Sequence, residues 1–369
     1  MACVNPGKEK RTINFARGVP PPEAFPTQQL QECARAVLER EGSVVLQYHP
    51  AAGLVSLREW LADRYDVAME CVLVSNGSLQ ILDFVSRLLA SPGDVVLVER
   101  PSYDRAITLF RRAGLRVIGV PLGPRGFESE TLERLLIDEK PKLFYIIPDF
   151  QNPTGISTSL DKRETLVALA EKHGFWIVED SPYRDLRYWG EEVSAIFSLG
   201  SEKVLHLSSF SKVLSPGMRV GYVLGPEHVV SALTKIAEDT YITPNMVSQG
   251  LVFEYCRRGW LGPNIERLKS LYRPRLGTLA SALQAYLPQA QWTRPEGGFF
   301  VGAYLPSGVD VSLLKAKAHE ERVALSDGRG FFPDEDGSGF LRLPFCALSA
   351  QNIQEGMSRL GSIVNMLTG

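Results

Sequence analysis

Short apolar runs alternate with amphipathic helical patterns over the first two thirds of the chain. Seven of these runs are rich in Val, Ile and Leu and nearly continuous in apolar residues, as strands buried on both faces are. They lie at residues 72–75, 95–99, 116–121, 143–148, 176–180, 204–208 and 220–224. Helical patterns separate most of the runs, so the sequence predicts an α/β fold with a mostly parallel seven-stranded sheet.

The pattern changes after Pro244, where the regular alternation stops. Helical patterns follow at 268–288, 311–322 and 350–366, with strand-like pieces at 298–304 and 340–343. These elements indicate a second, smaller α+β domain. We therefore expect three parts, which are an N-terminal arm with part of the small domain at 1–45, a large domain at 46–262 and a C-terminal small domain at 263–369.

Polar residues and one glycine predict where several helices begin or end. Ser56 and Glu59 form a capping-box pattern before the first buried strand. Ser78 is placed to cap the helix that follows that strand. Gly174 fits the end of a later helix, because glycine accepts the left-handed conformation that closes many helices.

Composition excludes several classes of protein. The chain has 369 residues, 44% of them hydrophobic, and a net charge of −2 at pH 7. No tract of like charge indicates binding to nucleic acid or to a membrane surface. No segment approaches the ~20 apolar residues that cross a bilayer, and residues 1–11 lack the apolar core of a signal peptide. We therefore expect a cytoplasmic protein.

The cysteines and histidines are too scattered to indicate a disulfide framework or a metal site. No C-x-x-C pair occurs among Cys3, Cys33, Cys71, Cys256 and Cys346. Five scattered cysteines are typical of free thiols in a reducing compartment. The five histidines show no metal-binding spacing either, so we expect no metal.

Several familiar motifs are missing from the sequence. It has no G-x-G-x-x-G after the first strand and no G-x-x-x-x-G-K-[ST], so a nucleotide-binding dehydrogenase or a P-loop enzyme has no local support. It also has no G-x-S-x-G nucleophile elbow.

Three other segments lie at or just after predicted strand ends. They are residues 151–155 (QNPTG), 179–183 (EDSPY) and 208–212 (SSFSK), the last followed by 216–221 (PGMRVG). Each alone is compatible with a turn, a helix cap or a surface lysine. Ligands of open α/β sheets bind beyond the carboxyl ends of strands, so the three together indicate one binding site.

In combination, these segments resemble the fold type I, pyridoxal-phosphate-dependent aminotransferases of class I and II. The chain is most similar to 2-aminoadipate and kynurenine aminotransferases and to the aminotransferase half of MocR-type regulators. Further matching motifs are residues 15–20 (FARGVP), 46–48 (LQY), 76–78 (NGS), 99–103 (ERPSY), 295–299 (PEGGF) and 341–343 (LRL). The resemblance implies an aspartate-aminotransferase-like fold and pyridoxal 5'-phosphate (PLP) as cofactor. No DNA-binding extension precedes these motifs, so we expect an enzyme and not a regulator.

The resemblance also implies roles for individual residues. Lys212 would form a Schiff base with the cofactor and then shuttle protons. Asp180 would hold the pyridine nitrogen protonated, so that the ring withdraws electrons. Asn152 and Tyr183 match the pair that binds the ring oxygen, and Tyr103 matches the ring that stacks on the cofactor.

The phosphate would be bound at a helix N-terminus, where backbone N–H groups favour an anion. The matching residues are Gly77, Ser78, Leu79, Ser209, Ser211 and Arg219. In the family, a tyrosine from the neighbouring subunit also reaches the phosphate, and Tyr48 matches it. The resemblance therefore implies a homodimer with shared active sites.

Arg342 matches the arginine that binds the substrate carboxylate. The resemblance also implies substrate contacts from Asn152 and from the backbone near Gly18, which would lie opposite. The sequence departs from the family at Leu79, which is usually polar, at Ser181, which is often a second Asp, and at two arginines. Arg17 replaces a small residue, and Arg329 is an additional cation. These two indicate an anionic or polar substrate group, unless they are solvated or pair with Asp334 or Glu335.

We therefore predict PLP-dependent transfer of an amino group from an L-amino acid to a 2-oxo acid. The alternative is a PLP-dependent lyase, cyclase, decarboxylase or oxidase of specialised metabolism, since the protein selects among these reactions by orienting one bond of the substrate. A non-catalytic sensor is a further hypothesis, and the intact Lys212, Asp180 and Arg342 argue against it.

Overall fold

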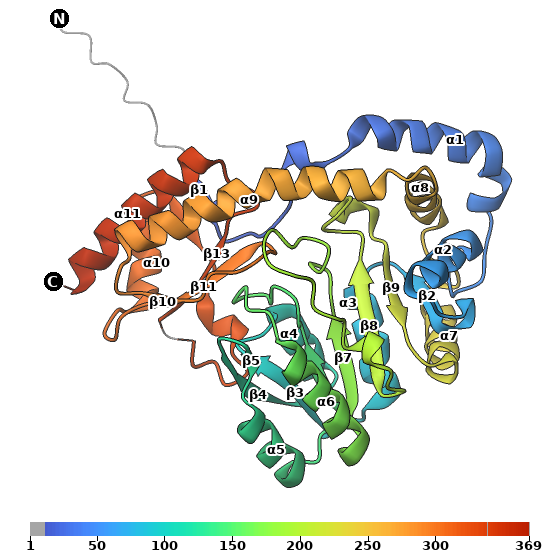
Figure 1. The fold of residues 1–369 in the computed structure, drawn as a ribbon, viewed down its shortest axis with the longest axis horizontal. Helices are drawn as coiled ribbons and strands as arrows, with labels where there is room; N and C mark the ends of the chain where they lie inside the picture. Colours follow the sequence, from blue (N-terminus) through green and yellow to red (C-terminus); the bar gives the residue numbers. More distant parts are fainter. Residues whose placement is uncertain (1–11, 338, 369) are drawn as a thin grey trace, which may run out of the picture.

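The computed structural model describes residues 12–337 and 339–368, and its largest element is an eight-stranded sheet (Figure 1). The strand order is β2-β9-β8-β7-β6-β3-β4-β5. The strands are β2 (Val72–Ser75), β3 (Val95–Arg100), β4 (Arg116–Gly123), β5 (Gly126–Phe127), β6 (Leu143–Ile146), β7 (Trp176–Asp180), β8 (Val204–Ser209) and β9 (Gly221–Leu224). All seven predicted strands are present, which confirms the α/β fold, and β5 adds a two-residue strand at one edge.

The directions of the strands bring several strand ends together. Strands β8, β7, β6, β3 and β4 are parallel, whereas β9 is antiparallel to both of its neighbours and β5 is antiparallel to β4. Two successive antiparallel pairings make β2 parallel to β8. The segments that follow β2, β3, β6, β7 and β8 therefore meet at one edge, where open α/β sheets bind ligands.

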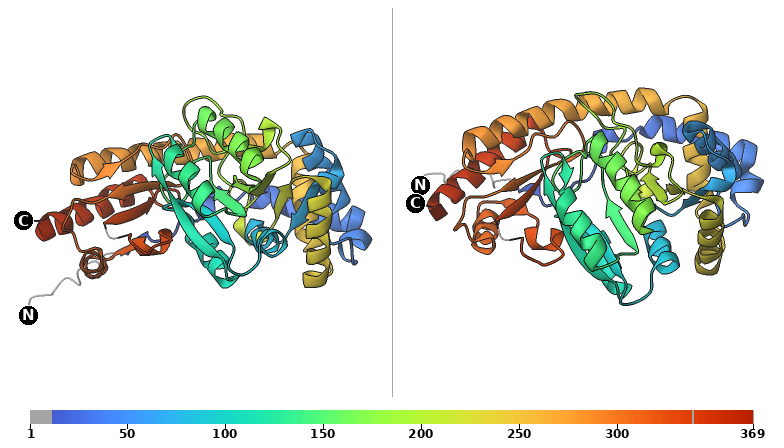
Figure 2. Two further views of the ribbon diagram at one scale, coloured as in Figure 1. Left: turned by 90° about the horizontal axis from the view of Figure 1, so that it is seen from below. Right: turned by 60° about the horizontal axis from the view of Figure 1, so that its bottom comes forward.

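Helices precede and follow these strands and form several of the long crossovers that parallel neighbours need. The helices are α2 (Val55–Tyr65), α3 (Ser78–Leu89), α4 (Asp104–Arg112), α5 (Ser129–Asp138), α6 (Leu160–His173), α7 (Glu227–Tyr241) and α8 (Met246–Arg257). Helices α5 and α6 bury their apolar residues on one face of the sheet, and α3, α4 and α7 on the other (Figure 2). Short 3-10 helices lie at Pro22–Ala24, Met69–Cys71, Phe197–Leu199, Pro216–Met218 and Gly328–Phe331.

A smaller α+β unit follows in the C-terminal third. Its antiparallel sheet has the order β10-β11-β13, and a parallel pair joins β1 to β12. The elements are β1 (Ile13–Phe15), β10 (Gln291–Trp292), β11 (Phe300–Tyr304), β12 (Val323–Leu325), β13 (Phe340–Pro344), α9 (Leu261–Tyr286), α10 (Val311–Glu320) and α11 (Ala350–Thr368). Helix α9 extends from the neighbourhood of α8 along α11, and so links the two units (Figure 1).

The N-terminal arm contacts both units. Strand β1 joins the small unit through β12, whereas α1 (Thr27–Val45) packs along α8 of the large unit. The predicted boundary at 262/263 falls inside α9. The division at 45/46 and 262/263 stays a prediction. Within the described residues, no helix is long and apolar enough to cross a membrane.

Two predicted helix caps are wrong. Helix α3 begins at Ser78 itself, after Gly77, and no side chain caps it. Helix α2 begins after Leu54, so Ser56 lies inside its first turn and does not cap it. The predicted end at Gly174 is confirmed, because Gly174 closes α6 with φ of 78°. The expectation for residues 1–11, and with it Cys3, lies outside the described residues.

Candidate active site

A pocket of about 150 Å3 lies where the carboxyl ends of β2, β3, β6, β7 and β8 meet. It is lined by Ser78, Leu79, Leu82, Tyr103, Ile147, Asn152, Asp180, Pro182, Tyr183, Ser209, Ser211, Lys212 and Arg219. Most of these are residues that the sequence predicts for the cofactor. The fold therefore brings together side chains that follow five different strands.

Lys212 follows β8 and extends into the pocket beside two aromatic rings. Its Nζ lies 5.7 Å from the ring centre of Tyr183 and 5.8 Å from that of Phe299. Burial lowers the pKa of Lys212, and the positive charges of Arg219 and Arg342 act in the same direction. A lower pKa leaves more of the amine neutral, as a nucleophilic lysine has to be.

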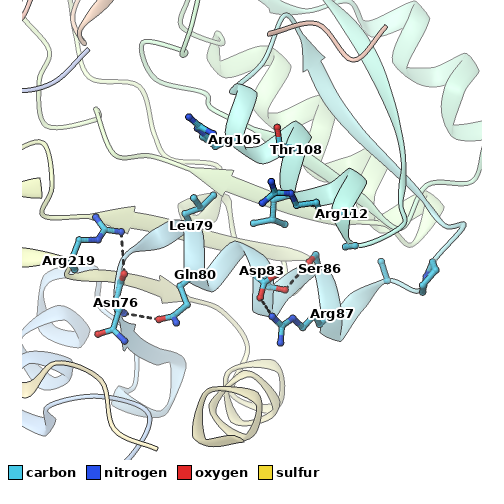
Figure 3. Close-up of a pocket in the computed structure, with 14 residues that line it drawn as sticks. Asn76, Leu79, Gln80, Asp83, Ser86, Arg87, Arg105, Thr108, Arg112 and Arg219 are labelled. Carbon is cyan, nitrogen blue, oxygen red and sulfur yellow. Dashed lines mark hydrogen bonds and ion pairs between the residues drawn. The ribbon is translucent and has the colours of Figure 1, made fainter. Parts of the chain in front are cut away.

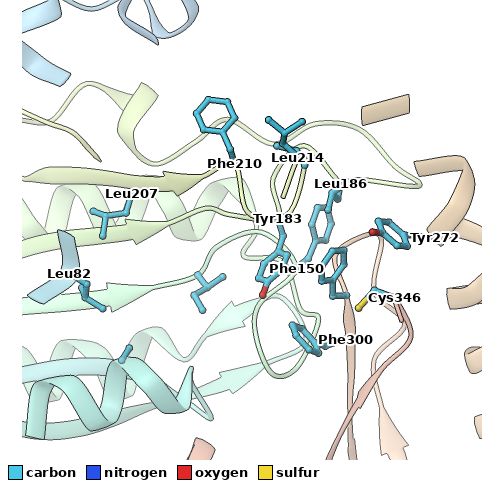
Figure 4. Packing of buried hydrophobic residues seen from close by; sticks show 14 of the residues in the cluster. Leu82, Phe150, Tyr183, Leu186, Leu207, Phe210, Leu214, Tyr272, Phe300 and Cys346 are labelled. Carbon is cyan, nitrogen blue, oxygen red and sulfur yellow. The ribbon is translucent and has the colours of Figure 1, made fainter. Parts of the chain in front are cut away.

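Buried aromatic side chains, Tyr183 and Phe300 among them, pack together on this side of the pocket (Figure 4). The ring of Tyr183 lies 5.5 Å from that of Phe299 and 5.9 Å from that of Phe300. Tyr272 packs edge-on against Phe299 at 5.1 Å, and Cys346 lies in the same cluster. The two rings near the Lys212 amine, Tyr183 and Phe299, therefore belong to a packed aromatic cluster.

Asp180 ends β7 and is only 7% exposed. Its Oδ2 accepts a hydrogen bond of 2.7 Å from the hydroxyl of Tyr145 on β6. Its Oδ1 is buried and has no partner among the described residues. Burial raises the pKa of Asp180 to about 6, although the Tyr145 hydrogen bond and the charge of Lys212 favour the ionised form. A buried oxygen without a partner costs about 1–3 kcal/mol, which the N–H group of a ligand would offset.

The opposite end of the pocket presents backbone N–H groups and one arginine. First-turn N–H groups of a helix have no intrahelical acceptor, and no side chain caps α3. Arg219 has a left-handed φ of 54°, and its Nη2 donates to the carbonyl of Asn76 at 3.2 Å. Gly77 has a φ of 104°, which favours glycine, and a Cβ there would lie 2.2 Å from Arg219 Nη2 and would displace the guanidinium. This combination suits an anion such as phosphate.

Two serines complete this anion-binding end. Ser209 Oγ lies 2.8 Å from Ser211 Oγ and 3.1 Å from the carbonyl oxygen of Val220. The Ser211 N–H donates to Ser209 Oγ at 3.1 Å. Leu79 lines the same pocket but contributes no polar side-chain atom.

Arg342, on β13, approaches the site from the small unit. Its Nη1 donates to Asn152 Oδ1 at 3.2 Å, and its Nη2 donates to the carbonyl of Ala16 at 2.9 Å. The guanidinium carbon lies 4.9 Å from the ring centre of Phe300 and 4.6 Å from that of Phe331. Burial lowers the pKa of Arg342, and its buried Nε has no partner among the residues that the structure describes. The N–H group at Nε suits a carboxylate.

The N-terminal arm lies beside Arg342. Gly18 packs so closely on Phe300 that a Cβ there would lie 2.1 Å from the ring. Arg17 is exposed, and within 12–337 and 339–368 it forms no ion pair or side-chain hydrogen bond. Arg17 is therefore a free cation next to the Ala16 carbonyl that binds Arg342.

Two predicted residues lie away from the pocket. Arg329 is exposed and pairs with Asp327 at 2.9 Å, so neither Asp334 nor Glu335 is its partner. The local Asp-x-Arg spacing could have predicted this pair. Tyr48 is 76% exposed and does not line the pocket of its own chain.

Behind Asn152, a buried glutamine that carries no predicted role ties two loops together. Gln151 Nε2 donates to Glu99 Oε2 at 3.2 Å and to the carbonyl of Pro101 at 2.7 Å. Its Oε1 accepts from the N–H and the hydroxyl of Thr154. Burial raises the pKa of Glu99 to about 8. This network fixes the loop of Asn152 against the loop that precedes α4.

A larger groove of about 970 Å3 lies between α3 and α4 (Figure 3). It shares Leu79 and Arg219 with the smaller pocket. Neither Lys212 nor Asp180 lines it. The chemistry therefore belongs to the smaller pocket, although the groove is the larger cavity.

The model of the family "aminotransferase class I and II" matches residues 10–360. The chain belongs to this family. A relative named 2-aminoadipate transaminase, from Thermus thermophilus, is 38% identical over 354 residues, which are 95% of this chain and 89% of the relative. Aromatic-amino-acid aminotransferase 1 of Thermococcus litoralis is 35% identical over 365 residues, covering 95% of this chain and 88% of the relative.

A similar solved structure is that of α-aminoadipate aminotransferase from Thermus thermophilus, complexed with N-(5'-phosphopyridoxyl)-L-leucine. Its TM-score is 0.93 at 37% identity, and the match covers 97% of this chain and 93% of that chain. The aspartate-aminotransferase-like fold is thereby confirmed.

The aminotransferase uses PLP to transfer amino groups between amino acids and 2-oxo acids. The relatives favour this reaction over the lyase, cyclase, decarboxylase and oxidase alternatives. The pocket also fits the cofactor. Lys212 would supply an amine for its aldehyde, Asp180 Oδ1 would be an unpaired acceptor for its ring nitrogen, and the N-terminus of α3 would offer a site for its phosphate.

Proposed function

We propose that Lys212, Asp180 and Arg342 carry the separate tasks of transamination in this chain. The bound cofactor supplies a ring that withdraws electrons from the substrate α-carbon. Lys212 holds the cofactor covalently, Asp180 holds its ring nitrogen, and Arg342 holds the substrate carboxylate. The observation that carries the proposal is that the Lys212 amine and the unpaired Asp180 oxygen lie in one buried pocket.

Lys212 is proposed to act as the base of the reaction. The Lys212 amine would remove the α-proton of the substrate and would return it. Its lowered pKa supports this role, because a base must be neutral before it accepts a proton.

Three further side chains are proposed to position the cofactor ring. Asn152 and Tyr183 bind its ring oxygen, and Tyr103 covers one face. All three line the pocket with Lys212. Burial raises the pKa of Tyr103 to about 12 and that of Tyr183 well above its usual value, so both hydroxyls stay protonated and able to donate.

The phosphate is proposed to bind the N-terminus of α3. Its partners are the backbone of Gly77, Ser78 and Leu79 and the side chains of Ser209, Ser211 and Arg219. We further propose a homodimer in which Tyr48 reaches the phosphate of the second subunit. The 76% exposure of Tyr48, next to the 71% exposed Leu46, supports an interface between copies.

For the substrate, we propose an L-amino acid whose side chain carries a second anionic group near Arg17. Two observations support this, namely the free Arg17 guanidinium next to Ala16 and the relative named 2-aminoadipate transaminase. We also propose a cytoplasmic location, because four described cysteines, Cys33, Cys71, Cys256 and Cys346, are free thiols.

Reduction of the holoenzyme with borohydride and peptide mapping tests the first proposal. We expect the cofactor on Lys212 alone, and a label on another lysine would overturn the assignment. A panel of amino acids then tests the substrate class. 2-Aminoadipate and glutamate should react better than leucine, and Arg17→Gln should remove this preference while leaving the leucine rate unchanged.

A further inference from the structure

An acidic segment of the small unit lies against the large unit near the substrate end of the pocket. We use this name for residues 333–336, which include Asp334, Glu335 and Asp336. The segment directly follows Phe331 and Phe332, whose side chains are each 2% exposed. The position of the acidic segment is therefore coupled to that of two buried rings.

Arg100, the last residue of β3, binds this segment from the large unit. Its Nε lies 2.8 Å from Asp334 Oδ2, and its Nη2 lies 3.5 Å from Asp336 Oδ2. Its guanidinium carbon also lies 5.2 Å from the ring centre of Phe332. Gly119 on the neighbouring strand leaves room for this side chain, since a Cβ there would lie 2.8 Å from Arg100 Cβ.

Arg111 on α4 makes a second contact with the acidic segment. Its Nη1 lies 3.2 Å from Glu335 Oε1, and its Nη2 donates to the carbonyl of Pro333 at 2.6 Å. A third contact comes from the backbone, where the Ser102 N–H donates to the carbonyl of Phe331 at 2.8 Å. The β3–α4 connection therefore binds the whole stretch from Phe331 to the acidic segment.

Phe331 carries this contact to the substrate end of the site. Its ring centre lies 4.6 Å from the guanidinium carbon of Arg342, on which Phe300 also packs. A ring at this distance limits the orientations that a guanidinium can take. Ser102, which holds the Phe331 backbone, directly precedes Tyr103 in the pocket.

The ion pairs are weak enough to open. Arg111 and Glu335 are 42% and 71% exposed, and Asp334 is 51% exposed. Exposed pairs of this kind are individually weak and are screened by salt. Burial alone would raise the pKa of Asp334, but the Arg100 hydrogen bond brings it below its usual value, so the carboxylate stays charged.

We propose that Arg100 and Arg111 hold the acidic segment as an ionic latch, which keeps Phe331 against Arg342 and thereby sets the affinity for the amino acid. This inference rests on the proposed role of Arg342 as the carboxylate anchor. Arg100 and Arg111 are positioning residues, because they act through Phe331. The latch acts on the substrate end of the site and leaves the phosphate end at Arg219 unchanged.

The first test compares steady-state kinetics of holoenzyme with those of the double variant Arg100→Gln/Arg111→Gln. Loss of the three ion pairs that Arg100 and Arg111 form with the acidic segment should raise KM for the amino donor about 3- to 20-fold, with unchanged cofactor content. Raising the ionic strength from about 0.01 M to about 1 M should raise KM more in wild type than in the variant, because only wild type has a latch to screen. Arg116→Gln is the matched control, since it removes an exposed 3.1 Å pair with Glu139 away from the site.

A charge swap separates the latch from a simple packing role. Arg100→Glu should raise KM, and Arg100→Glu/Asp334→Arg should restore it at least in part. A merely structural role for Arg100 would change the melting temperature of both variants and leave KM unmoved. No rescue of KM in the swapped variant would overturn the proposal.

Amide hydrogen exchange at Ser102 reports the latch independently of Arg342. Exchange of the Ser102 amide should be faster in Arg100→Gln/Arg111→Gln than in wild type and unchanged in Arg116→Gln. An exchange rate that is unchanged in all variants would overturn the latch. Faster exchange without a KM change would overturn its role in substrate binding. In that case the Arg342→Lys variant tests the proposed role of Arg342 separately. The kcat/KM of this variant falls only if Arg342 binds the substrate carboxylate.

Discussion

The hydroxyl of Tyr145 and the carboxylate of Asp180 form a hydrogen bond of 2.7 Å between two neighbouring strands. This bond occupies Oδ2 and leaves only Oδ1 of Asp180 for a ligand. Tyr145 therefore determines how the carboxylate faces the pocket. It also stabilises the ionised form of Asp180, against the burial that raises the pKa to about 6.

Tyr145→Phe should weaken the enzyme through Asp180 and not through the fold. Loss of a hydrogen bond to a charged group costs about 1.5–3 kcal/mol, so we expect cofactor affinity or kcat to fall about 10- to 100-fold. The pKa of Asp180 should rise further in this variant. Titration of the apoprotein with cofactor measures the affinity, and a kinetic assay measures kcat. Circular dichroism serves as the folding control. An enzyme with wild-type affinity and rate would show that Tyr145 only packs.

The affinity of the apoprotein for PLP should decrease as the pH falls through about 6. Burial holds the pKa of Asp180 at about 6, above the ordinary value of about 3.9, so the carboxyl takes up a proton below this pH. A protonated carboxyl cannot pair with a pyridinium cation. The Asp180→Asn variant should bind PLP weakly at every pH. Dividing the PLP affinity of wild type by that of the variant cancels the titration of the cofactor itself. A constant ratio between pH 5 and 8 contradicts the prediction.

Arg342→Lys should lower kcat/KM for α-amino acids while the cofactor stays bound. Lysine keeps the charge but loses the planar pair of donors, a loss of about 1.5–3 kcal/mol for a charge-assisted hydrogen bond. The proposed phosphate site, at Arg219 and the α3 N-terminus, does not involve Arg342, so the absorbance of the bound cofactor should be unchanged. Amines without a carboxylate serve as the internal control, because their rates should not change.

Gly77→Ala should reduce cofactor affinity more than it reduces stability. The added Cβ would lie 2.2 Å from Arg219 Nη2 and would displace the guanidinium from the anion-binding end. We expect at least a tenfold weaker affinity for PLP, as for the loss of a charge-assisted hydrogen bond.

Gly93→Ala is the matched control for this substitution. Gly93 has a φ of 93°, close to the 104° of Gly77, but a Cβ at residue 93 meets no atom within 4 Å. Both variants should therefore lose a similar free energy of unfolding from backbone strain, about 1 kcal/mol. Equal cofactor affinity in the two variants would show that the contact with Arg219 is unimportant.

The strands could be predicted because their burial leaves a continuous apolar pattern in the sequence. Strand β5 could not be predicted from the sequence, because Gly126–Phe127 is too short to show a hydrophobic pattern. The caps at Ser56 and Ser78 were predicted wrongly because tertiary contact decides them. At α3, Gly77 occupies the N-cap position with a φ of 104°, so Ser78 is already the first residue of the helix.

The residues that line the pocket could be predicted from motifs that follow strand ends. Tyr145 and Phe331 could not be predicted in this way, because each contacts a site residue that is not its neighbour in the sequence. Tyr145 contacts Asp180, and Phe331 contacts Arg342. Their roles depend on strand pairing and on the contact between the two units. For Arg329 the sequence suggested Asp334 or Glu335 as partners, whereas the observed partner, Asp327, lies only two residues away.

The origin of Arg342 and its neighbours has a consequence for how this enzyme can change over generations. Arg342 and Phe331 come from the small unit, and Ala16 comes from the N-terminal arm, whereas Lys212 and Asp180 belong to the large sheet. Under the proposed roles of these residues, substitutions in the first group alter which amino acid is accepted while the cofactor stays bound. New substrate preferences can thus arise by drift in two short stretches of sequence, with the chemistry inherited intact.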